Sequence, residues 1–209
     1  LYVSSEWRRS IVLEAQARIS ALQALIRPHF LFNSMNTIAS LTRSDPQKAE
    51  EAVEDLSDLL RVTLQSPADM SSLQQELEIA KTYERIEKLR LDDRLNVRWQ
   101  LGDLPLHARL PTLTIQPLLE NAIYHGIELL PGGGEIVVSG RQKEDALEIQ
   151  LTNPVDGSRV REDDGNKMAL SNIKERFELA FAGKGTVDLV ERDGLFTATL
   201  TFPEQVDAE

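Results

Sequence analysis

Two segments of this chain carry polar side chains whose spacing suits chemistry on a helix face. The first is the run Arg27-Pro28-His29-Phe30-Leu31-Phe32-Asn33. His29, Asn33 and Asn36 are spaced i, i+4 and i+7, so their side chains share one stripe of a helix. Pro28 costs about 3 kcal/mol or more inside a helix, because it lacks an N–H and crowds the preceding turn. We interpret the run as a bend that presents the imidazole of His29 to a reactant. A bent helix with a partly exposed, chemically idle histidine fits the same residues.

The second segment is Gln116-Pro117-Leu118-Leu119-Glu120-Asn121-Ala122-Ile123-Tyr124-His125-Gly126. Glu120, Asn121 and His125 interrupt an otherwise apolar helix, and Asn121 and His125 are i, i+4 neighbours. A carboxamide oxygen is a suitable ligand for Mg²⁺, which keeps several waters and takes further ligands from phosphates. His125 either contacts a phosphate or caps the end of the helix. The segment is therefore suited to hold Mg²⁺ beside a phosphate, and a polar helix end without a ligand is the alternative.

The elements around His29 are predicted to be helices. Residues 6–42 have the apolar spacing of one long helix with a kink at Pro28. A turn at Ser44-Asp45-Pro46 leads into a second helix over residues 47–65, with the proline in a helix-starting position. Two helices joined by a short turn form a hairpin that is too thin to bury both apolar stripes. The hairpin therefore packs against a second copy, giving a homodimeric four-helix bundle, or against the rest of its own chain.

The remainder of the chain alternates between helices and short strands. Ser72 is predicted to cap a third helix that ends near Leu91. The elements expected after it are a strand over residues 96–101, a helix over 112–129, strands over 135–141 and 146–152, a polar loop over 153–167, a helix over 169–181, and strands over 185–191 and 196–202. Helices on one face of a mixed sheet form a two-layer α/β sandwich, so the predicted fold class is α+β.

Composition narrows the class of protein. The chain has 209 residues, 41% hydrophobic and 27% charged, as expected of a folded domain or two. Its net charge of −11 argues against direct binding to nucleic acid, which depends on neutralising phosphates with Lys and Arg. The chain has no cysteine, which excludes disulfides and thiolate zinc sites and favours a reducing cytosol.

The N-terminal residues predict a nearby membrane. No apolar run approaches the roughly 20 residues that span a bilayer, and no signal peptide is recognisable. The chain nevertheless begins at Leu1-Tyr2-Val3, and Trp7, Arg8 and Arg9 follow, a pattern typical of the cytoplasmic edge of a membrane helix. We expect the cytoplasmic portion of an inner-membrane protein. The alternative is a fragment whose start is arbitrary.

The two motifs together resemble a known family. His29 within Pro-His-Phe-Leu-Phe-Asn, followed about ninety residues later by Gln-Pro-Leu-Leu-Glu-Asn-Ala-Ile-Tyr-His-Gly, is similar to the LytS-type sensor histidine kinases, and to their AlgZ-like subgroup in particular. The resemblance extends in collinear order from about Ile19 to Phe202. It implies dimerisation and phosphoacceptor helices over residues 1–70, a connecting helix over 71–94, and a catalytic ATP-binding domain over 95–209. That domain would be similar in fold to the gyrase, Hsp90, histidine kinase and MutL superfamily.

The resemblance also implies roles for individual residues. His29 would accept the phosphoryl group, and Asn121 would bind Mg²⁺. Asn153 stands where the superfamily has the aspartate that reads the adenine amino group. The other positions expected near ATP are His125, Gly126, Gly165, Lys167, Met168, Leu170, Asn172 and Arg176.

Several positions depart from the family pattern. Residues 165–172 match the family's glycine-rich lid and the start of the helix after it. Lys167 and Ala169 replace two glycines of that lid, and glycine permits the closest approach of backbone to phosphate. Lys167 either supplies a cation in compensation or is a solvated loop lysine. Asn153 replaces an aspartate, and neutral acceptors form weaker hydrogen bonds than carboxylates, so ATP affinity is expected to be weak.

A third departure concerns the base. Phe30 follows His29 where many other histidine kinases carry an acidic residue. Glu120 is the remaining candidate, acting through a water, and an ordinary carboxylate near the site is the alternative.

The predicted function is ATP-dependent autophosphorylation of His29, followed by phosphoryl transfer to an aspartate of a response regulator. The resemblance implies a homodimer and a LytTR-type DNA-binding regulator as partners, and ATP and Mg²⁺ as cofactors. A degenerate kinase that serves as a regulator-binding scaffold is the main alternative. An ATP-driven conformational switch without phosphohistidine is the other.

Overall fold

The computed structural model describes residues 28–63, 69–157 and 164–204, and for Pro28 and residues 164–168 it describes the backbone alone. The helix predicted upstream of Pro28, and with it the kink, lies outside the described residues. The chain divides into two compact units after Gln65. The third helix lies in the second unit, together with the sheet. The functional division into residues 1–70, 71–94 and 95–209 stays a prediction.

The first unit contains a helical hairpin, α2 (Pro28–Ser44) and α3 (Pro46–Thr63). Asp45 is the single residue between them, and its carboxylate accepts a hydrogen bond of 3.2 Å from the backbone N–H of Lys48. That bond holds the pKa of Asp45 below its ordinary value. Asp45 thus caps α3, and Pro46 occupies the first helical position, where its missing N–H costs nothing. The predicted turn is confirmed.

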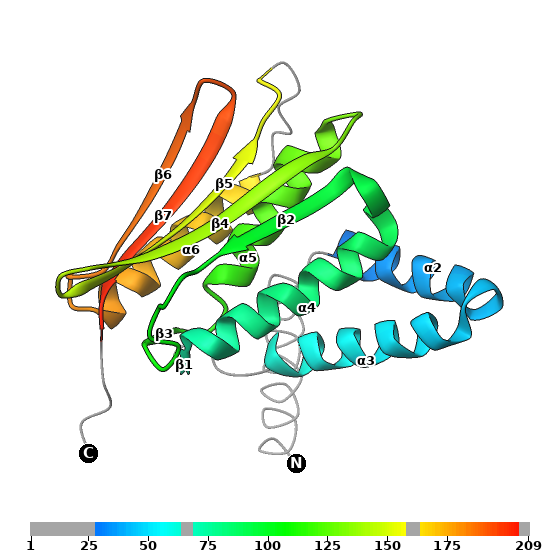
Figure 1. Ribbon diagram of the computed structural model, residues 1–209, viewed down its shortest axis with the longest axis horizontal. Helices are drawn as coiled ribbons and strands as arrows, with labels where there is room; N and C mark the ends of the chain where they lie inside the picture. The colour runs from blue at the N-terminus through cyan, green and yellow to red at the C-terminus, as the bar shows by residue number, and fades with distance from the viewer. Residues whose placement is uncertain (1–27, 64–68, 158–163, 205–209) are drawn as a thin grey trace, which may run out of the picture. The chain divides into compact units, whose positions relative to one another are not determined.

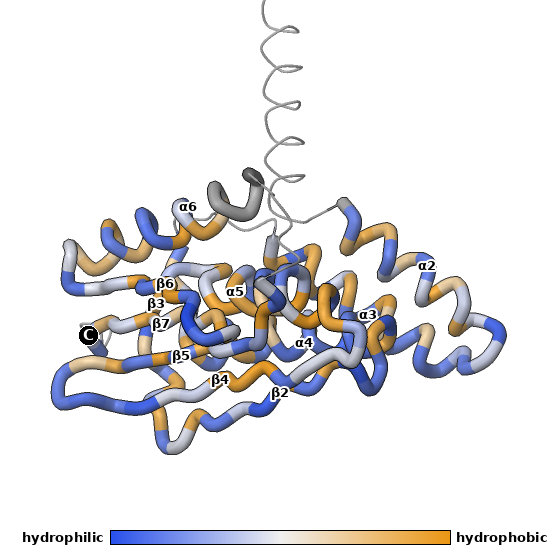
Figure 2. The backbone as a smooth tube through the Cα atoms, turned by 90° about the horizontal axis from the view of Figure 1, so that it is seen from above, coloured by the Kyte–Doolittle hydropathy of each residue, from blue (hydrophilic) through white to orange (hydrophobic). Residues whose placement is uncertain are grey.

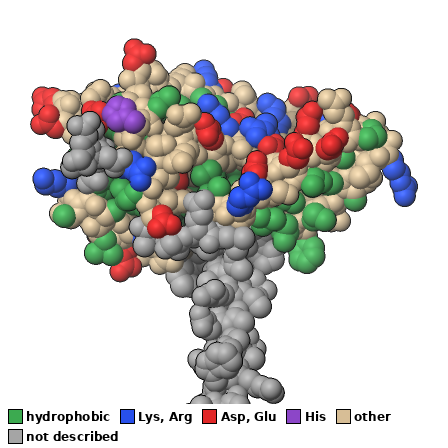
Figure 3. All heavy atoms as spheres, turned by 90° about the horizontal axis from the view of Figure 1, so that it is seen from below, with side chains coloured by type: hydrophobic (Ala, Val, Ile, Leu, Met, Phe, Trp, Pro, Cys, Tyr) green, Lys and Arg blue, Asp and Glu red, His purple; other side chains and the backbone are tan. Residues whose placement is uncertain are grey.

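The hairpin has a buried face and an exposed apolar one. The buried residues of α3 recur every three or four positions, as expected of one helix face: Ala49, Ala52, Leu56, Leu59 and Thr63. Phe32 and Met35 of α2 remain exposed, Phe32 to 70%. Hydrophobic side chains are visible at the surface over this hairpin in Figure 3.

The second unit is built on a mixed five-stranded sheet in the order β2-β4-β5-β7-β6. The strands are β2 (Leu95–Gln100), β4 (Gly134–Lys143), β5 (Ala146–Pro154), β6 (Thr186–Arg192) and β7 (Leu195–Pro203). Strands β2 and β4 pair in parallel, and the other neighbours pair antiparallel. Helices α5 (Ile115–Asn121) and α6 (Asp164–Ala180) lie on the same face of the sheet, while α4 (Leu73–Leu91) packs against α5 and β2 (Figures 1 and 2).

Alternation along the strands explains which face the helices cover. In β5 the residues Leu147, Ile149, Leu151 and Asn153 are buried, whereas Gln150 and Thr152 between them are half-exposed. This period of two directs one apolar row toward α5 and α6 and one polar row away from them. Phe177, Phe181 and Phe202 pack edge-to-face or tilted at the α6 end, with ring centroids 4.9 to 5.6 Å apart.

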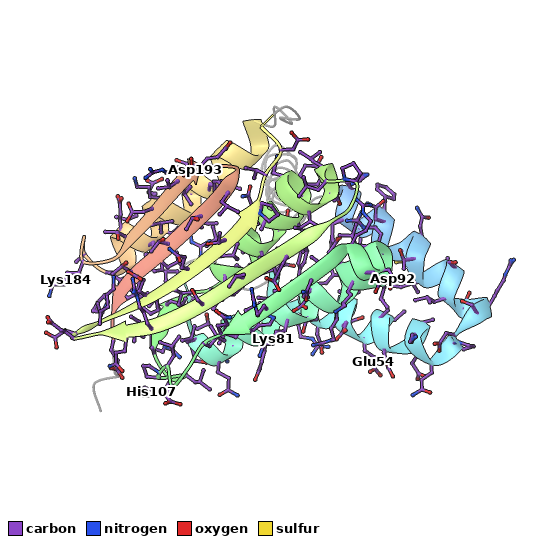
Figure 4. All side chains as sticks on the ribbon, turned by 45° about the horizontal axis from the view of Figure 1, so that its top comes forward. Glu54, Lys81, Asp92, His107, Lys184 and Asp193 are labelled. Atoms are coloured by element: carbon purple, nitrogen blue, oxygen red, sulfur yellow. The ribbon has the colours of Figure 1, made fainter. Side chains whose placement is uncertain are left out.

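The predicted α+β class, with its two-layer sandwich, is confirmed. Ser72 caps α4 in a reciprocal capping box with Gln75, as expected of that pattern. Asp92 ends the helix with a positive φ of 50° and turns the chain toward β2 (Figure 4).

Three local features differ from the predictions. A two-stranded sheet of β1 (Met70–Ser72) and β3 (Arg109–Pro111) was missed, because three-residue strands carry little periodicity. The helix predicted over residues 112–129 is not uniform. It is α5, then a π-helical turn η2 (Ala122–Gly126), then a short 3₁₀ turn η3 (Ile127–Leu129). Helix α6 begins at Asp164, five residues before the predicted start at Ala169.

Candidate functional site

Asn121 lies at the junction of α5 and the π-helical turn η2. Asn121 is 5% exposed, and no group of the described residues donates a hydrogen bond to its Oδ1. A buried acceptor left in this state costs roughly 1–3 kcal/mol. Single π-helical turns are rare and occur often at functional sites. The donor chemistry of Asn121 therefore fits the predicted magnesium ligand, a hard oxygen held in a buried position.

Asn153, at the end of β5, presents a second oxygen of the same kind. Asn153 is 1% exposed, and its Nδ2 donates to the carbonyl of Pro154 at 3.0 Å. Within the part of the chain that the structure describes, its Oδ1 accepts no hydrogen bond. Because the amide nitrogen is engaged, the oxygen is the atom left to accept from a ligand. A buried carboxamide oxygen without a hydrogen-bond donor is suited to accept a hydrogen bond from a group such as an adenine amino group.

Gly126 lies directly against Asn153 and joins the π-helical turn to β5. A Cβ atom at Gly126 would lie 2.3 Å from Asn153 Nδ2 and 2.7 Å from the carbonyl oxygen of Pro154. No side chain fits in that space, so the glycine permits the close packing of η2 on β5. The structure thus brings Gly126 and Asn153 together, as the predicted nucleotide site requires.

His125 lies on the same turn and is half-buried. Its ring packs edge-on to that of Tyr124, with centroids 4.9 Å apart. The imidazole lies just beyond the end of α5, where a capping role is equally consistent with its position. Its contact with phosphate stays a prediction.

Glu120 belongs to a carboxylate-rich cluster between α4 and η3. It accepts a hydrogen bond of 3.0 Å from Gln116 Nε2. Arg90 forms ion pairs with Glu87 and Glu128 in the same cluster. Burial raises the pKa of Glu87, Arg90 opposes that effect, and the nearby charges of Glu128 and Glu120 add to it. The role of Glu120 as a base stays a prediction.

The predicted lid residues lie within α6. The backbone of Gly165, Lys167 and Met168 is helical, and their side chains lie outside the description. Leu170 is half-buried and Asn172 is exposed. Because α6 starts at Asp164, residue 169 lies inside the helix and is not its first residue, as the predicted range 169–181 had it.

Arg176 of α6 reaches back to the segment that precedes α5. Its guanidinium donates to the carbonyl oxygen of Thr112. Burial lowers the pKa of Arg176, and the carboxylate of Glu76 opposes that shift. Its predicted contact with a nucleotide stays untested, and the contact it makes here ties α6 to the start of α5.

Glu76 is the residue that the sequence reading missed. It is 0% exposed, and its two carboxylate oxygens accept hydrogen bonds from the backbone N–H groups of Leu113, Thr114 and Ile115 at 2.7 to 3.0 Å. The sequence nevertheless contains a signal that points to this residue. Leu73, Leu77 and Ala80 define the apolar face of the third helix, and Glu76 falls on that face. A carboxylate there needs a buried partner.

His29 lies in the first unit, near the start of α2. Its ring is exposed, and its Nδ1 is 3.2 Å from the side-chain nitrogen of Asn33, one turn along the helix. The predicted polar stripe of His29 and Asn33 is therefore real. A half-turn of the Asn33 carboxamide would bring its Oδ1 to the ring in the same space.

The described residues show neither a metal-binding cluster nor a membrane-spanning helix. In residues 28–63, 69–157 and 164–204, no group of three or more His, Asp or Glu side chains is arranged to hold a metal ion. A magnesium site at Asn121 would thus depend on phosphate oxygens and water for its other ligands. No helix in these ranges combines the length and apolarity needed to cross a membrane.

Comparisons with known proteins show which proteins this chain resembles. A family model described as histidine kinase matches residues 17–95. The sensor histidine kinase BtsS of Escherichia coli strain K12 is 34% identical over 149 residues, covering 71% of this chain and 27% of that protein. The sensor protein LytS of Staphylococcus saprophyticus is 31% identical over 185 residues, covering 83% of this chain and 31% of that protein.

A third curated relative and one solved structure extend the comparison. The sensor histidine kinase YpdA of Escherichia coli strain K12 is 35% identical over 179 residues, covering 81% of this chain and 31% of that protein. The histidine kinase AdeS of Acinetobacter baumannii is 18% identical, with a TM-score of 0.47, over 92% of this chain and 98% of that chain. The chain spans about a third or less of the length of these curated relatives. Residues 17–95 match the histidine kinase family, and the relatives of this chain are LytS-type and other sensor histidine kinases.

Proposed function

We propose that this chain is the kinase core of a sensor histidine kinase that binds ATP in its second unit and phosphorylates itself on His29. The observation that carries the proposal is the pair of buried amide oxygens, Asn121 Oδ1 and Asn153 Oδ1, to which no group in residues 28–63, 69–157 and 164–204 donates. They lie on elements that Gly126 holds in direct contact. One suits a magnesium ion and the other suits the amino group of adenine.

The proposed binding divides the nucleotide between these two residues. Asn153 accepts from the adenine amino group, with its own nitrogen held by the carbonyl of Pro154. Asn121 holds Mg²⁺, which supplies charge neutralisation for the phosphates. Phosphoryl transfer depends on such positioning and charge neutralisation more than on covalent help from the protein. Affinity for ATP is expected to be weak, because a neutral acceptor replaces a carboxylate at residue 153.

The proposed reaction is a phosphoryl transfer from ATP to His29. An unprotonated ring nitrogen of His29 donates its lone pair to the γ-phosphorus, an N–P bond forms, and the bond from phosphorus to the β-phosphate oxygen breaks. ADP leaves with that electron pair. The phosphoryl group then passes to an aspartate carboxylate of a response regulator, which restores neutral His29.

The exposed apolar face of the hairpin supports a homodimer. Phe32, Met35 and Val53 are each about half-exposed or more, and surfaces of this kind mark sites of association. Two hairpins packed through these side chains would form the four-helix bundle.

The other proposed properties concern the whole protein. We place the chain on the cytoplasmic side of an inner-membrane protein, with a LytTR-type DNA-binding regulator as its partner. Direct contact with nucleic acid is not expected. The net charge is −11, and on the face shown in Figure 3 the described acidic and basic side chains are interspersed without a continuous basic area.

One experiment tests the proposal against its alternatives. The protein is incubated with γ-labelled ATP and Mg²⁺ beside His29→Gln. Acid-labile label on the parent alone supports the kinase. Release of free phosphate that the substitution leaves unchanged supports an ATP-driven switch. Absence of any nucleotide chemistry, with binding of the regulator retained, supports a degenerate kinase acting as a scaffold.

A further inference from the structure

The start of α5 is an anion-binding backbone turn that is already filled by a side chain of the protein. Leu113 has a positive φ of 58°, and Thr114 follows with φ −99° and ψ −49°. A left-handed residue next to a right-handed one turns successive N–H groups toward a common point. The carboxylate of Glu76 occupies that point, with N–H to oxygen distances of 2.7 Å from Leu113, 2.7 Å from Thr114 and 3.0 Å from Ile115.

Glu76 replaces the usual cap of a helix N-terminus. The hydroxyl of Thr114, the residue in the capping position, donates instead to the carbonyl of Pro111 at 2.6 Å. Ser71 donates its hydroxyl to Glu76 Oε1 at 3.0 Å, so each carboxylate oxygen receives two hydrogen bonds. Four hydrogen-bond donors thus converge on the two oxygens of Glu76. A carboxylate suits this arrangement, because both of its oxygens only accept hydrogen bonds.

A cation on a second helix also contacts this turn. Arg176 of α6 donates to the carbonyl of Thr112, the residue just before the turn, and it interacts electrostatically with Glu76. The N-terminal end of α5 is therefore held by α4 through Glu76 and by α6 through Arg176. A helix of seven residues is too short to hold its own position by local hydrogen bonds.

We propose that Glu76 is a positioning residue for the metal–nucleotide site: it anchors the first turn of α5 and thereby sets the place of Asn121 at the other end. The two ends are six residues apart, or roughly 9 Å along the helix axis. Metal and phosphate ligands must be held to within about 0.5 Å of the productive geometry. The inference rests on the proposed function, since it assigns Glu76 a part in magnesium and nucleotide binding by Asn121.

The test measures how strongly the metal and the nucleotide help each other bind. The dissociation constant of ADP is measured by calorimetry on the full chain, with Mg²⁺ and with a chelator, and the ratio of the two is the metal coupling. Glu76→Gln keeps the size of the side chain but replaces one acceptor oxygen with an NH₂ donor that faces N–H groups. We expect the coupling ratio to fall at least tenfold and metal-free ADP binding to change less than threefold.

The matched control is Glu84→Gln, the same chemical change on the same helix. Glu84 accepts from Trp99 Nε1 at 2.8 Å and so links α4 to β2. Its coupling ratio is expected to stay within twofold of the parent. Amide hydrogen exchange without nucleotide provides a second readout, with faster exchange over residues 113–121 in Glu76→Gln and parent-like exchange there in Glu84→Gln.

The outcomes separate the inference from the proposed function. If the parent binds no ADP under either condition, the proposed function fails. If the parent shows metal coupling and Glu76→Gln retains it, the positioning role is overturned. The role is also overturned if Glu76→Gln loses metal-free and metal-bound ADP affinity by the same factor. Should Glu76→Gln not fold, Ser71→Ala, which removes one of the four donors, decides the matter. A twofold to fivefold loss of coupling supports the inference, and an unchanged ratio contradicts it.

Discussion

Gly126 and Asn153 pack so closely that a Cβ atom at the glycine would lie 2.3 Å from the amide nitrogen of the asparagine. The asparagine nitrogen is in turn held by the carbonyl of Pro154 at 3.0 Å. The contact joins the π-helical turn after Asn121 to the last residues of β5. Two elements that carry predicted nucleotide ligands are thereby held to each other by backbone and amide atoms.

Replacing Gly126 with alanine is expected to destabilise the protein. The added methyl group must displace Asn153 or the backbone at Pro154, and overpacking of this kind costs about 1–3 kcal/mol. Urea unfolding measures the change in free energy. Gly132→Ala is the control, since nothing lies within 4 Å of a Cβ there and its φ is not positive. Equal stabilities of the two variants would contradict the packing argument.

Replacing Asn121 with alanine is expected to separate stability from binding. The substitution removes a buried oxygen that receives no hydrogen bond from the protein, so the free energy of unfolding should change by less than about 1 kcal/mol. Affinity for magnesium-bound ATP, measured by calorimetry, should fall at least tenfold. Asn121→Asp, which keeps an oxygen ligand, should retain magnesium-dependent binding. A loss of stability without a loss of magnesium dependence would assign Asn121 to the core alone.

Asn33 is expected to orient the ring of His29. If Asn33 Oδ1 accepts from Nδ1–H, the other ring nitrogen keeps its lone pair for attack on phosphorus. One hydrogen bond contributes about 1 kcal/mol, so Asn33→Ala should slow autophosphorylation roughly fivefold. Asn33→Asp, which can only accept, should keep the parental rate. The measurement is the initial rate of label incorporation at saturating ATP. A slow Asn33→Asp variant beside a normal Asn33→Ala variant would contradict the proposed direction of the hydrogen bond between Asn33 and His29.

The buried cluster at Glu87 is expected to make stability depend on pH. Burial raises the pKa of Glu87 above its ordinary value of 4.5, so the folded state binds this proton more tightly than the unfolded chain. The resulting stability is complete below pH 4.5 and is lost as the pH rises through the folded-state pKa. In Glu87→Gln the free energy of unfolding should therefore fall less steeply with rising pH than in the parent. Urea unfolding at a series of pH values from 4.5 upward measures how steeply the free energy of unfolding changes with pH in each protein. Parallel curves for the parent and Glu87→Gln would exclude Glu87 as the cause of the pH dependence.

The core of the sandwich offers a test of the fold itself. Phe202 is fully buried and packs against Phe177 and Phe181. Truncation of a buried phenylalanine costs about 3–5 kcal/mol, so Phe202→Ala should lower the free energy of unfolding by that amount. Leu179→Ala, at a side chain that is 74% exposed, should have little effect. Comparable losses in both variants would place the core elsewhere.

Local patterns were enough to predict much of this molecule. Period-two alternation in residues 146–152 and three-to-four spacing in residues 47–65 report directly which face of a strand or helix is buried. The spacing of His29 and Asn33, and the polar interruption at Asn121, likewise follow from neighbours within one or two turns. Such features need no knowledge of distant segments, and the structure agrees with them.

The features that hold the site together depend on segments far apart in the chain. Glu76 caps residues 113–115 from 37 to 39 positions away, and Gly126 packs on Asn153 across 27 positions. Helix α6 also begins five residues earlier than its local pattern predicted. Periodicity shows that Glu76 falls on a buried face, but its partner is set by the packing of α4 on α5, and that packing is a property of the folded chain alone.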